Sequence, residues 1–466
     1  MATAVLSPLT HALARRSRNT AGWLERILHR PRAPLWLLGG VSLASLAARL
    51  IYLAKPFNPS THSAGLIFDE QYYVNAARVI LGIQPGAGNA YAQAALFHDP
   101  NAEHPPLVKL LIAGTMKVFG DNPWGWRIAP VIFGSMAILA MFWLVRSARG
   151  SAWLALGAAT LMAVDNLLLI HARVATLDIF VVTFMIVTVA LYLRGRPLLA
   201  GLALGVGLCT KIVAVDGIFI LVLLEVARVL MRNADEVRGR LAMARAKAIT
   251  LAKLVGVAAV TYVGLLFVLD LWVAPIGGPG NCPTVAGGFH NPLLHTVFML
   301  CFAGKLTSPG GPTGIASYPW QWLLNQSAID YYTLANNVVS GGKVITTHAV
   351  VTFQGEMNPA IIFLAMPGLA LAIQSAWQRR DTYSVVSAAW FLGTFVPFVL
   401  AAAPLGSYGN RTSYLYYMVV VLPGVYMAVA QLFSRRWLPR AALIGYAAIL
   451  GYWFVTLFPI RTWTGS

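Results

Sequence analysis

The sequence predicts an all-α, polytopic membrane protein, and three observations support this fold class. Of the 466 residues, 58% are hydrophobic and only 11% are charged, and the mean hydropathy is +0.68, which is far more apolar than a typical soluble domain. Apolar runs of about 20 residues recur along the chain, the length that a helix needs to cross a bilayer. An open sheet cannot span lipid, and a membrane barrel would alternate polar and apolar residues instead of grouping them.

Eleven apolar segments are interpreted as spans. The first follows the basic stretch "ARRSRNTAGWLERILHRPR", which carries no cleavage pattern of a signal peptide. We therefore expect residues 1–34 to be retained as a cytoplasmic segment and residues 35–466 to form one transmembrane domain. The predicted spans cover residues 35–54, 124–146, 152–171, 177–194, 197–211, 213–231, 251–274, 358–377, 383–404, 414–433 and 438–459.

The net charge of +18 follows the membrane topology. With the N-terminus inside, 22 of the 34 Lys and Arg residues fall in cytoplasmic segments, 11 fall outside and Arg49 lies within the first span. Basic residues gather on the cytoplasmic side of membrane proteins, so this distribution predicts an inside N-terminus and an outside C-terminus. It also accounts for the excess charge without a nucleic-acid partner.

Acidic residues show the opposite bias. Five of the 16 lie on the predicted cytoplasmic side and eleven lie outside or at outer ends of spans. Ionisable groups at membrane depth are costly and usually line a cavity or pair with one another. The sequence therefore predicts a polar chamber that opens outward, near the span-end residues Asp165, Asp178, Asp216 and Asp270.

Two outer loops are long, at about residues 55–123 and 275–357, but neither is long enough for a further globular domain. In the first loop, residues 69–81 and 106–119 are expected to form short helices in the outer interface. The second of these is too short to span comfortably, and we expect Lys109 and Lys117 to extend from it toward water.

The three cysteines predict little about the fold or the function. Cys209 falls within a span, whereas Cys282 and Cys301 share the second outer loop and would form a disulfide only in an oxidising compartment. The pairing stays open at this point. No set of Cys and His at zinc-ligand spacing is present, so we expect no metal site.

Two kinds of polar residue at the outer ends have ordinary structural explanations. The adjacent acids Asp69 and Glu70 in "FDEQYY" would suit the first turn of the helix over 69–81, where they could act as caps. Acid–base neighbours such as Arg173 and Asp178 in "HARVATLD" would form structural ion pairs. Lys211 and Asp216 repeat the same arrangement.

These explanations do not account for the convergence of so many ionisable residues on one face of the membrane. Acids together with Arg, Lys and His around an outward cavity suit a site that binds an anionic phosphate and deprotonates a hydroxyl group. The candidate residues of this site are Asp69, Glu70, His104, Lys109, Arg127, Arg173, Asp178, Lys211 and Arg411.

The first outer loop also resembles that of a known family. "FDEQYY" followed by "EHPPLVKLLIAGTMKVFGDNPWGWRIAPVIFG" is similar to the loop of the dolichyl-phosphate-mannose–protein mannosyltransferases, which belong to the GT-C class. "DNLLLIHARVATLDIF", "SYPWQWLL" and "RTSYLYYMVVVLPG" resemble later parts of that family. Two features depart from it: Val108 stands where the family usually has Gly, and the second outer loop lacks the MIR domain of the eukaryotic enzymes. The resemblance thus implies a compact, bacterial-type form with a GT-C-like fold.

The resemblance implies an inverting glycosyltransferase of the cell membrane. Its donor would be a polyprenyl-phosphate sugar, here mannose, and its acceptor a Ser or Thr hydroxyl of a protein on the outer face. It implies Asp69 as general base and Glu70 as the group that orients acceptor or sugar. The donor phosphate or sugar would meet His104, Lys109, Arg127, Arg173 and Arg411, with Asp178 orienting Arg173 and Lys211 as a weaker candidate. The lipid-linked sugar is a substrate and no separate cofactor is expected, while a requirement for a divalent metal stays open.

Two alternatives stay open. A GT-C transferase could instead act on a lipid or cell-envelope glycan, as the aminoarabinose and arabinosyl transferases do. A transporter or flippase would also use many spans and a polar cavity, but it predicts inverted repeats and broken helices near the bilayer midplane. In this sequence the charges lie near the outer interface instead.

Overall fold

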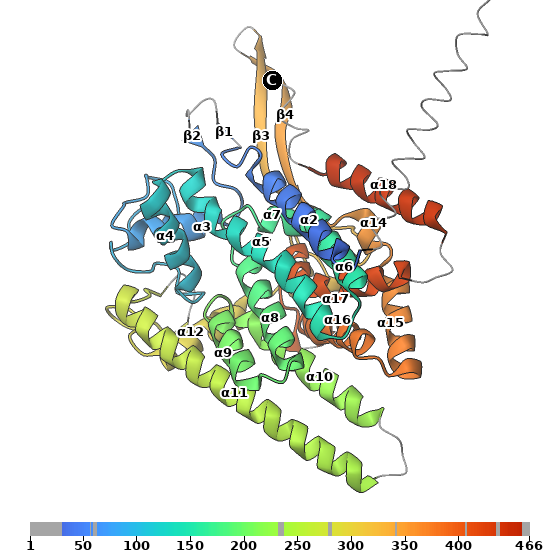
Figure 1. Ribbon diagram of the computed structural model, residues 1–466. Helices are drawn as coiled ribbons and strands as arrows, with labels where there is room; N and C mark the ends of the chain where they lie inside the picture. The colour runs from blue at the N-terminus through green and yellow to red at the C-terminus, as the bar shows by residue number, and fades with distance from the viewer. Residues whose placement is uncertain are drawn as a thin grey trace, which may run out of the picture.

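The protein is a bundle of helices, with short helices, loops and a long β-hairpin near one end (Figure 1). Most of the basic N-terminal segment, and the basic residues within 232–236 and 435–438, lie outside the described part of the chain. The computed structural model describes residues 30–55, 57–58, 63–231, 237–277, 282–340, 343–405, 408–434 and 439–458.

Each predicted span coincides with one helix or with two consecutive helices. In the described part of the chain, six helical segments are long and apolar enough to cross a membrane, judged by length and composition. They are α2 (Ala33–Leu50), α5 (Pro123–Ser147), α11 (Val237–Val273), α14 with α15 (Pro359–Ile362, Ala365–Arg379), α16 (Thr382–Ala402) and the 3-10 helix η2 with α17 (Leu415–Tyr417, Met418–Phe433).

The other predicted spans correspond to shorter helices. The polytopic helical prediction is confirmed, while the count of eleven spans is not. The shorter helices are α6 (Ala152–Val164), α7 (Asn166–His171), α8 (Asp178–Leu193), α9 (Pro197–Leu208), η1 (Ile212–Val215), α10 (Asp216–Leu230) and α18 (Arg440–Thr456).

The predicted span over 152–171 breaks at Asp165 because this residue caps the following helix. Asp165 Oδ1 accepts a hydrogen bond from the backbone N–H of Leu168 (3.0 Å), and Oδ2 accepts one from that of Asn358 (3.2 Å). A carboxylate in this position satisfies amide groups that a helix start leaves unpaired. Asp165 therefore has a structural role.

Helix α8 lies at the centre of the bundle, packed against α5 and α9. It is apolar on all sides and buried along almost its whole length, as expected of a central helix. Next to it, α9 packs closely on α11 through Gly201 and Gly205. A Cβ on Gly201 would lie 2.5 Å from the carbonyl oxygen of Leu254, and one on Gly205 would lie 2.7 Å from that of Ala258. The four-residue spacing of small residues thus lets two membrane helices touch along their backbones.

Two helices form in the first outer loop where the sequence predicts them, α3 (Glu70–Ile80) and α4 (Leu107–Phe119). One expectation about α4 is wrong. Lys109 does not extend toward water: its side chain is fully buried, and its Nζ lies 2.5 Å from Asp99 Oδ2. Lys117 is exposed, as expected.

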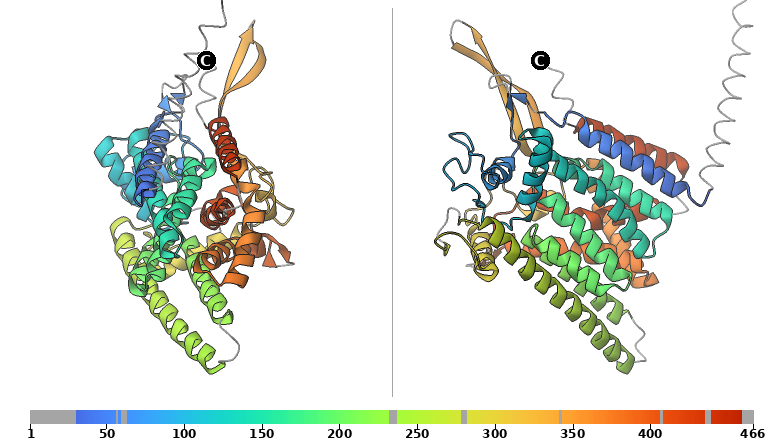
Figure 2. Two further views of the ribbon diagram at one scale, coloured as in Figure 1. Left: turned by 45° about the vertical axis from the view of Figure 1, so that its right-hand side comes forward. Right: turned by 60° about the vertical axis from the view of Figure 1, so that its left-hand side comes forward.

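The second long loop, at about residues 275–357, holds more structure than the sequence predicts. It contains α12 (Pro292–Lys305), α13 (Pro319–Trp322) and an antiparallel hairpin of β3 (Ile329–Ser340) and β4 (Lys343–Gly355). The hairpin projects beyond the helices (Figure 2). A Gly-Gly pair between two β-branched runs, at residues 341–342, is the sequence signal that predicts such a hairpin. The described residues also form two short antiparallel strand pairs, which are separate from this hairpin. They are β1 (Phe57–Asn58) with β2 (Ser63–Ala64) and β5 (Pro404–Leu405) with β6 (Tyr408–Gly409).

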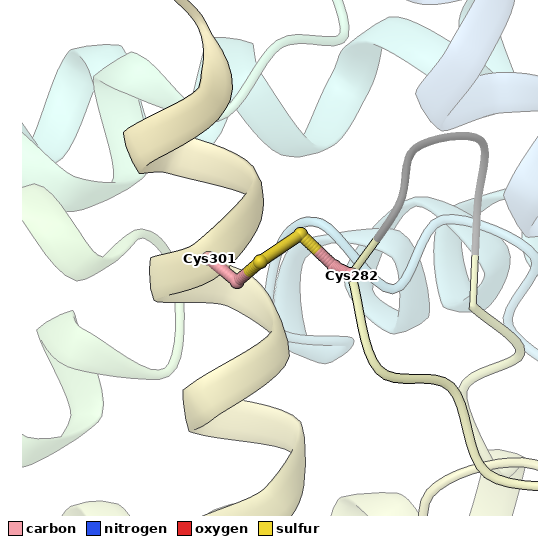
Figure 3. Close-up of a disulfide and its surroundings, with 2 residues drawn as sticks. All are labelled: Cys282 and Cys301. Carbon is pink, nitrogen blue, oxygen red and sulfur yellow. A yellow bond between two sulfur atoms is a disulfide. The ribbon is translucent and has the colours of Figure 1, made fainter.

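The disulfide that the sequence left open is formed. Cys282, on the segment before α12, is bonded to Cys301 within that helix (Figure 3). Cys209 remains as a buried free thiol. The bond therefore fixes α12 to the loop that precedes it.

Candidate active site

Asp69 sits at the start of α3 but does not cap it. Its side chain makes no capping hydrogen bond to the helix, and it lines a cavity instead. The preceding residue, Phe68, has φ of +51°, a left-handed conformation that is rare for a bulky side chain and indicates local strain. The Phe68 ring stacks on Tyr331 at a centroid distance of 4.5 Å. The turn before α3 is thus held in a shape that directs Asp69 away from the helix.

Glu70 forms a buried bidentate ion pair with Arg127 of α5. Arg127 Nε donates to Glu70 Oε1 (2.8 Å), and Nη2 donates to Oε2 (2.7 Å). The same carboxylate accepts the backbone N–H groups of Ile67 (2.7 Å) and Ala175 (3.0 Å). Glu70 therefore connects the turn before Asp69 to the backbone of Ala175, just before α8.

Arg127 uses all five of its N–H donors in this cluster. Besides Glu70, it donates to the carbonyl oxygens of Leu53 (2.7 Å), Lys55 (2.8 Å) and Gly65 (3.0 Å). These contacts join the end of α2, the start of the first loop and α5. A guanidinium satisfied in this way has no donor left for a substrate phosphate, so Arg127 is structural.

The cavity beside Asp69 has a volume of about 700 Å³ and is both polar and apolar, a size typical of ligand sites. On the polar side lie acids, His104, two cations and a group of tyrosines. On the apolar side lie aliphatic and aromatic side chains from η1, α12, α16 and α17, among them Val213, Leu300, Phe398 and Val420. A ligand with a charged head and a hydrocarbon chain would fit both sides.

Lys211 and Arg411 supply the cavity's positive charge. Lys211 Nζ lies 2.7 Å from Asp178 Oδ1 and stands over the rings of Tyr416 and Tyr417, at 5.5 and 5.4 Å from their centroids. Arg411 donates to the carbonyl oxygen of Ala303 in α12. Both side chains also line the open space. They are therefore placed to meet an anionic group.

The ion pairs expected from sequence neighbours are wrong. Asp178 does not orient Arg173, because its partners are Lys211 and His171, whose Nδ1 lies 3.4 Å from Asp178 Oδ2. Arg173 instead donates to the carbonyl oxygens of Ile51 (2.9 Å) and Tyr52 (3.2 Å). Lys211 accordingly pairs with Asp178, and not with Asp216.

His104 lies in the cavity wall as a neutral group. Burial lowers its pKa well below the ordinary value, and the nearby Lys211, Lys109 and Arg411 lower it further, against a smaller opposing effect of Asp178. A neutral imidazole can both donate and accept hydrogen bonds. Lys109 helps to fix the backbone of this segment, because its Nζ donates a hydrogen bond to the His104 carbonyl oxygen (2.8 Å).

Asp69 has the titration behaviour of a base that works near neutral pH. Burial raises its pKa to about 7, and the negative charge of Asp178 adds to this shift while Lys211 opposes it. A general base is most effective when its pKa lies near the working pH. Asp69 is thus ionised in a substantial fraction of molecules at neutral pH.

Of the nine residues predicted for the site, the structure brings five to the cavity wall and leaves four behind it. Asp69, His104, Asp178, Lys211 and Arg411 line the cavity. The other four are buried in contacts with the protein: Glu70, Lys109, Arg127 and Arg173.

Several other residues of the cavity wall are not among the nine predicted from the sequence. Glu103 directly precedes His104 in "EHPPLVK", and its acidic character in an apolar chain was the available signal. The tyrosines of "RTSYLYY" enter the cavity because η2 turns the chain there. The residues missed as site candidates are Phe68, Tyr72, Tyr73, Tyr91, Asn101, Glu103, Tyr414, Tyr416 and Tyr417.

Comparisons with known proteins find a similar family and similar individual proteins. The family model described as dolichyl-phosphate-mannose-protein mannosyltransferase matches residues 63–246, the stretch that contains Asp69, His104, Asp178 and Lys211. A polyprenol-phosphate-mannose–protein mannosyltransferase of Corynebacterium glutamicum is 24% identical, over 81% of this chain and 79% of that protein. One from Mycolicibacterium smegmatis is also 24% identical, over 92% and 90%.

Solved structures share the fold. The S. cerevisiae protein O-mannosyltransferase Pmt1–Pmt2 complex bound to the sugar donor matches with a TM-score of 0.66 at 13% identity, covering 93% of this chain and 90% of that one. ArnT from Cupriavidus metallidurans bound to undecaprenyl phosphate matches with a TM-score of 0.52 at 17% identity, covering 90% and 63%. This chain is therefore a multi-pass membrane glycosyltransferase of the GT-C fold, and its residues 63–246 are similar to the dolichyl-phosphate-mannose-protein mannosyltransferase family.

Proposed function

We propose that the protein transfers mannose from a polyprenyl-phosphate donor to a Ser or Thr hydroxyl of an acceptor protein, with inversion at the anomeric carbon. The observation that carries this proposal is the cavity itself. It has a carboxylate, Asp69, with a pKa near 7, two cations in Lys211 and Arg411, and an apolar wall. The names of the relatives above support mannose as the sugar and protein as the acceptor.

Asp69 acts as the general base. It takes the proton of the acceptor hydroxyl while the hydroxyl oxygen bonds to the anomeric carbon, on the face opposite the phosphate. The bond from that carbon to the phosphate oxygen breaks, and its electron pair stays on the polyprenyl phosphate. The leaving phosphate gains negative charge, which Lys211 and Arg411 stabilise.

The apolar wall takes the first units of the polyprenyl chain. Side chains of α12, α16 and α17 provide it, next to the two cations. The lipid thus reaches the site from within the membrane and needs no nucleotide pocket. That ArnT, with the same fold, has been solved with undecaprenyl phosphate supports this assignment.

One assay separates this function from its alternatives. Purified protein is incubated with mannosyl polyprenyl phosphate and a Ser/Thr-rich peptide, and both mannosylated peptide and released polyprenyl phosphate are measured. We expect the two products to form in equal amounts. Release that requires a lipid or glycan acceptor would support the GT-C alternative, and no release with any acceptor would support the transporter. The two bacterial relatives named above are mannosyltransferases, which favours the enzyme.

We place the cavity on the outer face of the membrane, with the N-terminus inside. The distribution of basic residues supports this orientation. We expect reporter fusions after residues 150, 240 and 380 to be cytoplasmic and fusions near 90 and 310 to be external. A cytoplasmic reporter at 310 would reverse the orientation and overturn the proposed location of the reaction.

Replacing either cavity cation by methionine should impair use of the donor. A charge-assisted contact to phosphate contributes roughly 1.5–3 kcal/mol, so Lys211→Met and Arg411→Met should each lower kcat/KM for the donor about tenfold to a hundredfold. The measurement varies a short-chain donor at saturating acceptor. Lys117→Met, at an exposed position of α4, is the matched control and should behave as wild type. Unchanged donor kinetics in both cavity variants would show that these cations do not bind the phosphate.

A further inference from the structure

One part of the cavity wall has no role in the transfer step described above. It consists of Glu103, Asn101, Tyr91 and Tyr72, all from α3 and the first outer loop. Glu103 is 92% buried, with 8% of its surface exposed, yet it lines the open space. A carboxylate kept in such a place at a cost in solvation usually has a partner.

Asn101 fixes the geometry of this cluster. Its Nδ2 donates to Glu103 Oε2 (2.8 Å) and to the Tyr91 hydroxyl (2.9 Å). Its own orientation is set from behind, where its backbone carbonyl accepts from Lys109 Nζ (2.5 Å) and its N–H donates to Asp99 Oδ1 (3.0 Å). The buried Lys109–Asp99 pair thus holds a group that faces the cavity.

These hydrogen bonds leave defined capacity for a ligand. The Tyr91 oxygen accepts a hydrogen bond from Asn101, so the Tyr91 hydroxyl can still donate its hydrogen to a ligand. A carboxylate can accept about four hydrogen bonds. Asn101 donates one hydrogen bond to Glu103, which leaves room for a ligand to donate another. Tyr72 lies edge-on to Tyr91, with ring centroids 6.4 Å apart. An acceptor, a donor and aromatic surface side by side match the hydroxyls and C–H faces of a sugar ring.

The cluster is connected to the base through α3, because Tyr72 lies in the first turn of this helix, which Asp69 directly precedes. Tyr73, the next residue of α3, has its ring centroid 6.0 Å from that of His104, which directly follows Glu103. The apolar wall and the cations belong to other elements, from η1 onward along the chain. With the phosphate at the cations and the acceptor at Asp69, the sugar ring is left facing Glu103.

We propose that Glu103, held by Asn101, binds a hydroxyl of the donor sugar and, with Tyr91, determines which sugar the enzyme transfers. This inference rests on the proposed function and adds the residues that select the sugar. It makes the polyprenyl-linked sugar, and not the acceptor, the ligand of this cluster.

The test compares Glu103→Gln with wild type on mannosyl polyprenyl phosphate and on its monodeoxy analogues. The amide keeps the size but loses the charge, and a hydrogen bond to a charged group is large enough for a loss of about tenfold to a hundredfold in kcat/KM for the mannosyl donor. On the one analogue that lacks the bound hydroxyl, wild type and variant should be equal. The KM for the acceptor should not change.

The chain offers a matched control and a second variant. Glu356 also accepts a hydrogen bond from an asparagine, Asn325 Nδ2 (2.8 Å), but it lies outside the cavity wall, so Glu356→Gln should leave all donors unaffected. If Glu103→Gln does not fold, Tyr91→Phe removes only a hydroxyl group and should show the same analogue-dependent loss.

Two outcomes would overturn the inference while transfer by wild type stands. One is a Glu103→Gln enzyme whose donor preference matches wild type on every analogue. The other is a change confined to the acceptor KM, which would assign Glu103 to the acceptor. A wild-type protein that transfers no mannose at all would instead overturn the proposed function.

Discussion

Asp69→Asn should reduce turnover about 10²–10⁴-fold, the usual cost of losing a general base. The amide has the same shape as the carboxylate but cannot take the proton of the acceptor hydroxyl. The side chain makes no capping hydrogen bond to α3, so the fold should not depend on its charge. Donor binding, measured by titration with a short-chain donor, should stay close to that of wild type.

The pH profile provides a second measurement on the same residue. Because burial raises the pKa of Asp69 to about 7, the carboxylate is protonated below that pH and inactive as a base. The kcat/KM of wild type should therefore rise with pH through about 7 and then level off. Asp69→Asn should lose this dependence along with the activity.

Asp330→Asn is a suitable control, because Asp330 is an exposed acid of β3 that does not line the cavity. It should retain wild-type turnover and the wild-type pH profile. An Asp69→Asn enzyme with the turnover of this control would exclude Asp69 as the base.

Much of the fold follows from sequence because lipid restricts the choice of backbone structure. A long apolar segment in a bilayer must be helical, and the predicted spans accordingly coincide with helices. The same constraint does not act on the outer loops, where β3 and β4 form. There the two strands form because they pair with each other, from Ile329 opposite Gly355 to Ser340 opposite Lys343. The apolar periodicity of a single segment does not reveal such a pairing.

The site was predictable as a region but not as a set of contacts. The sequence groups many charges at one end of the predicted spans, and several of these residues line the cavity. It does not say which acid meets which base, because Arg173 and Lys211 both lie within reach of Asp178 in the expected topology. The fold decides for Lys211, since the 172–177 turn directs Arg173 to the end of α2. The sequence also does not show that Lys109 and Arg127 are buried. Both pair with carboxylates inside the protein and do not line the cavity.

Glu70→Ala should destabilise the protein by roughly 3–5 kcal/mol, because it removes one member of a buried ion pair and leaves the other charge uncompensated. Arg127 loses its carboxylate partner, and the amides of Ile67 and Ala175 lose their acceptor. Unfolding can be followed by alkylation of Cys209, which is buried and is the one cysteine outside the disulfide. The thiol should react at clearly lower temperature in the variant.

Arg78→Ala is the matched control for this effect. Arg78 also pairs with an acid, Asp121, at 2.9 Å, but the two side chains are 17% and 29% exposed. Pairs that contact solvent typically contribute about 0–1 kcal/mol, so this variant should unfold close to wild type. If the Glu70→Ala and Arg78→Ala variants unfold at the same temperature, the buried ion pair does not stabilise the fold.

The double variant Glu70→Ala/Arg127→Met separates stability from the position of the base. With both charges gone, no buried charge is left uncompensated, so the double variant should regain part of the stability lost by Glu70→Ala. Its turnover should stay low, because the N–H of Ile67 and the carbonyl of Gly65 are still released and the turn that presents Asp69 is no longer held. Recovery of turnover together with stability would mean that Asp69 keeps its position without the ion pair, and that Phe68 stacked on Tyr331 is sufficient to hold the turn.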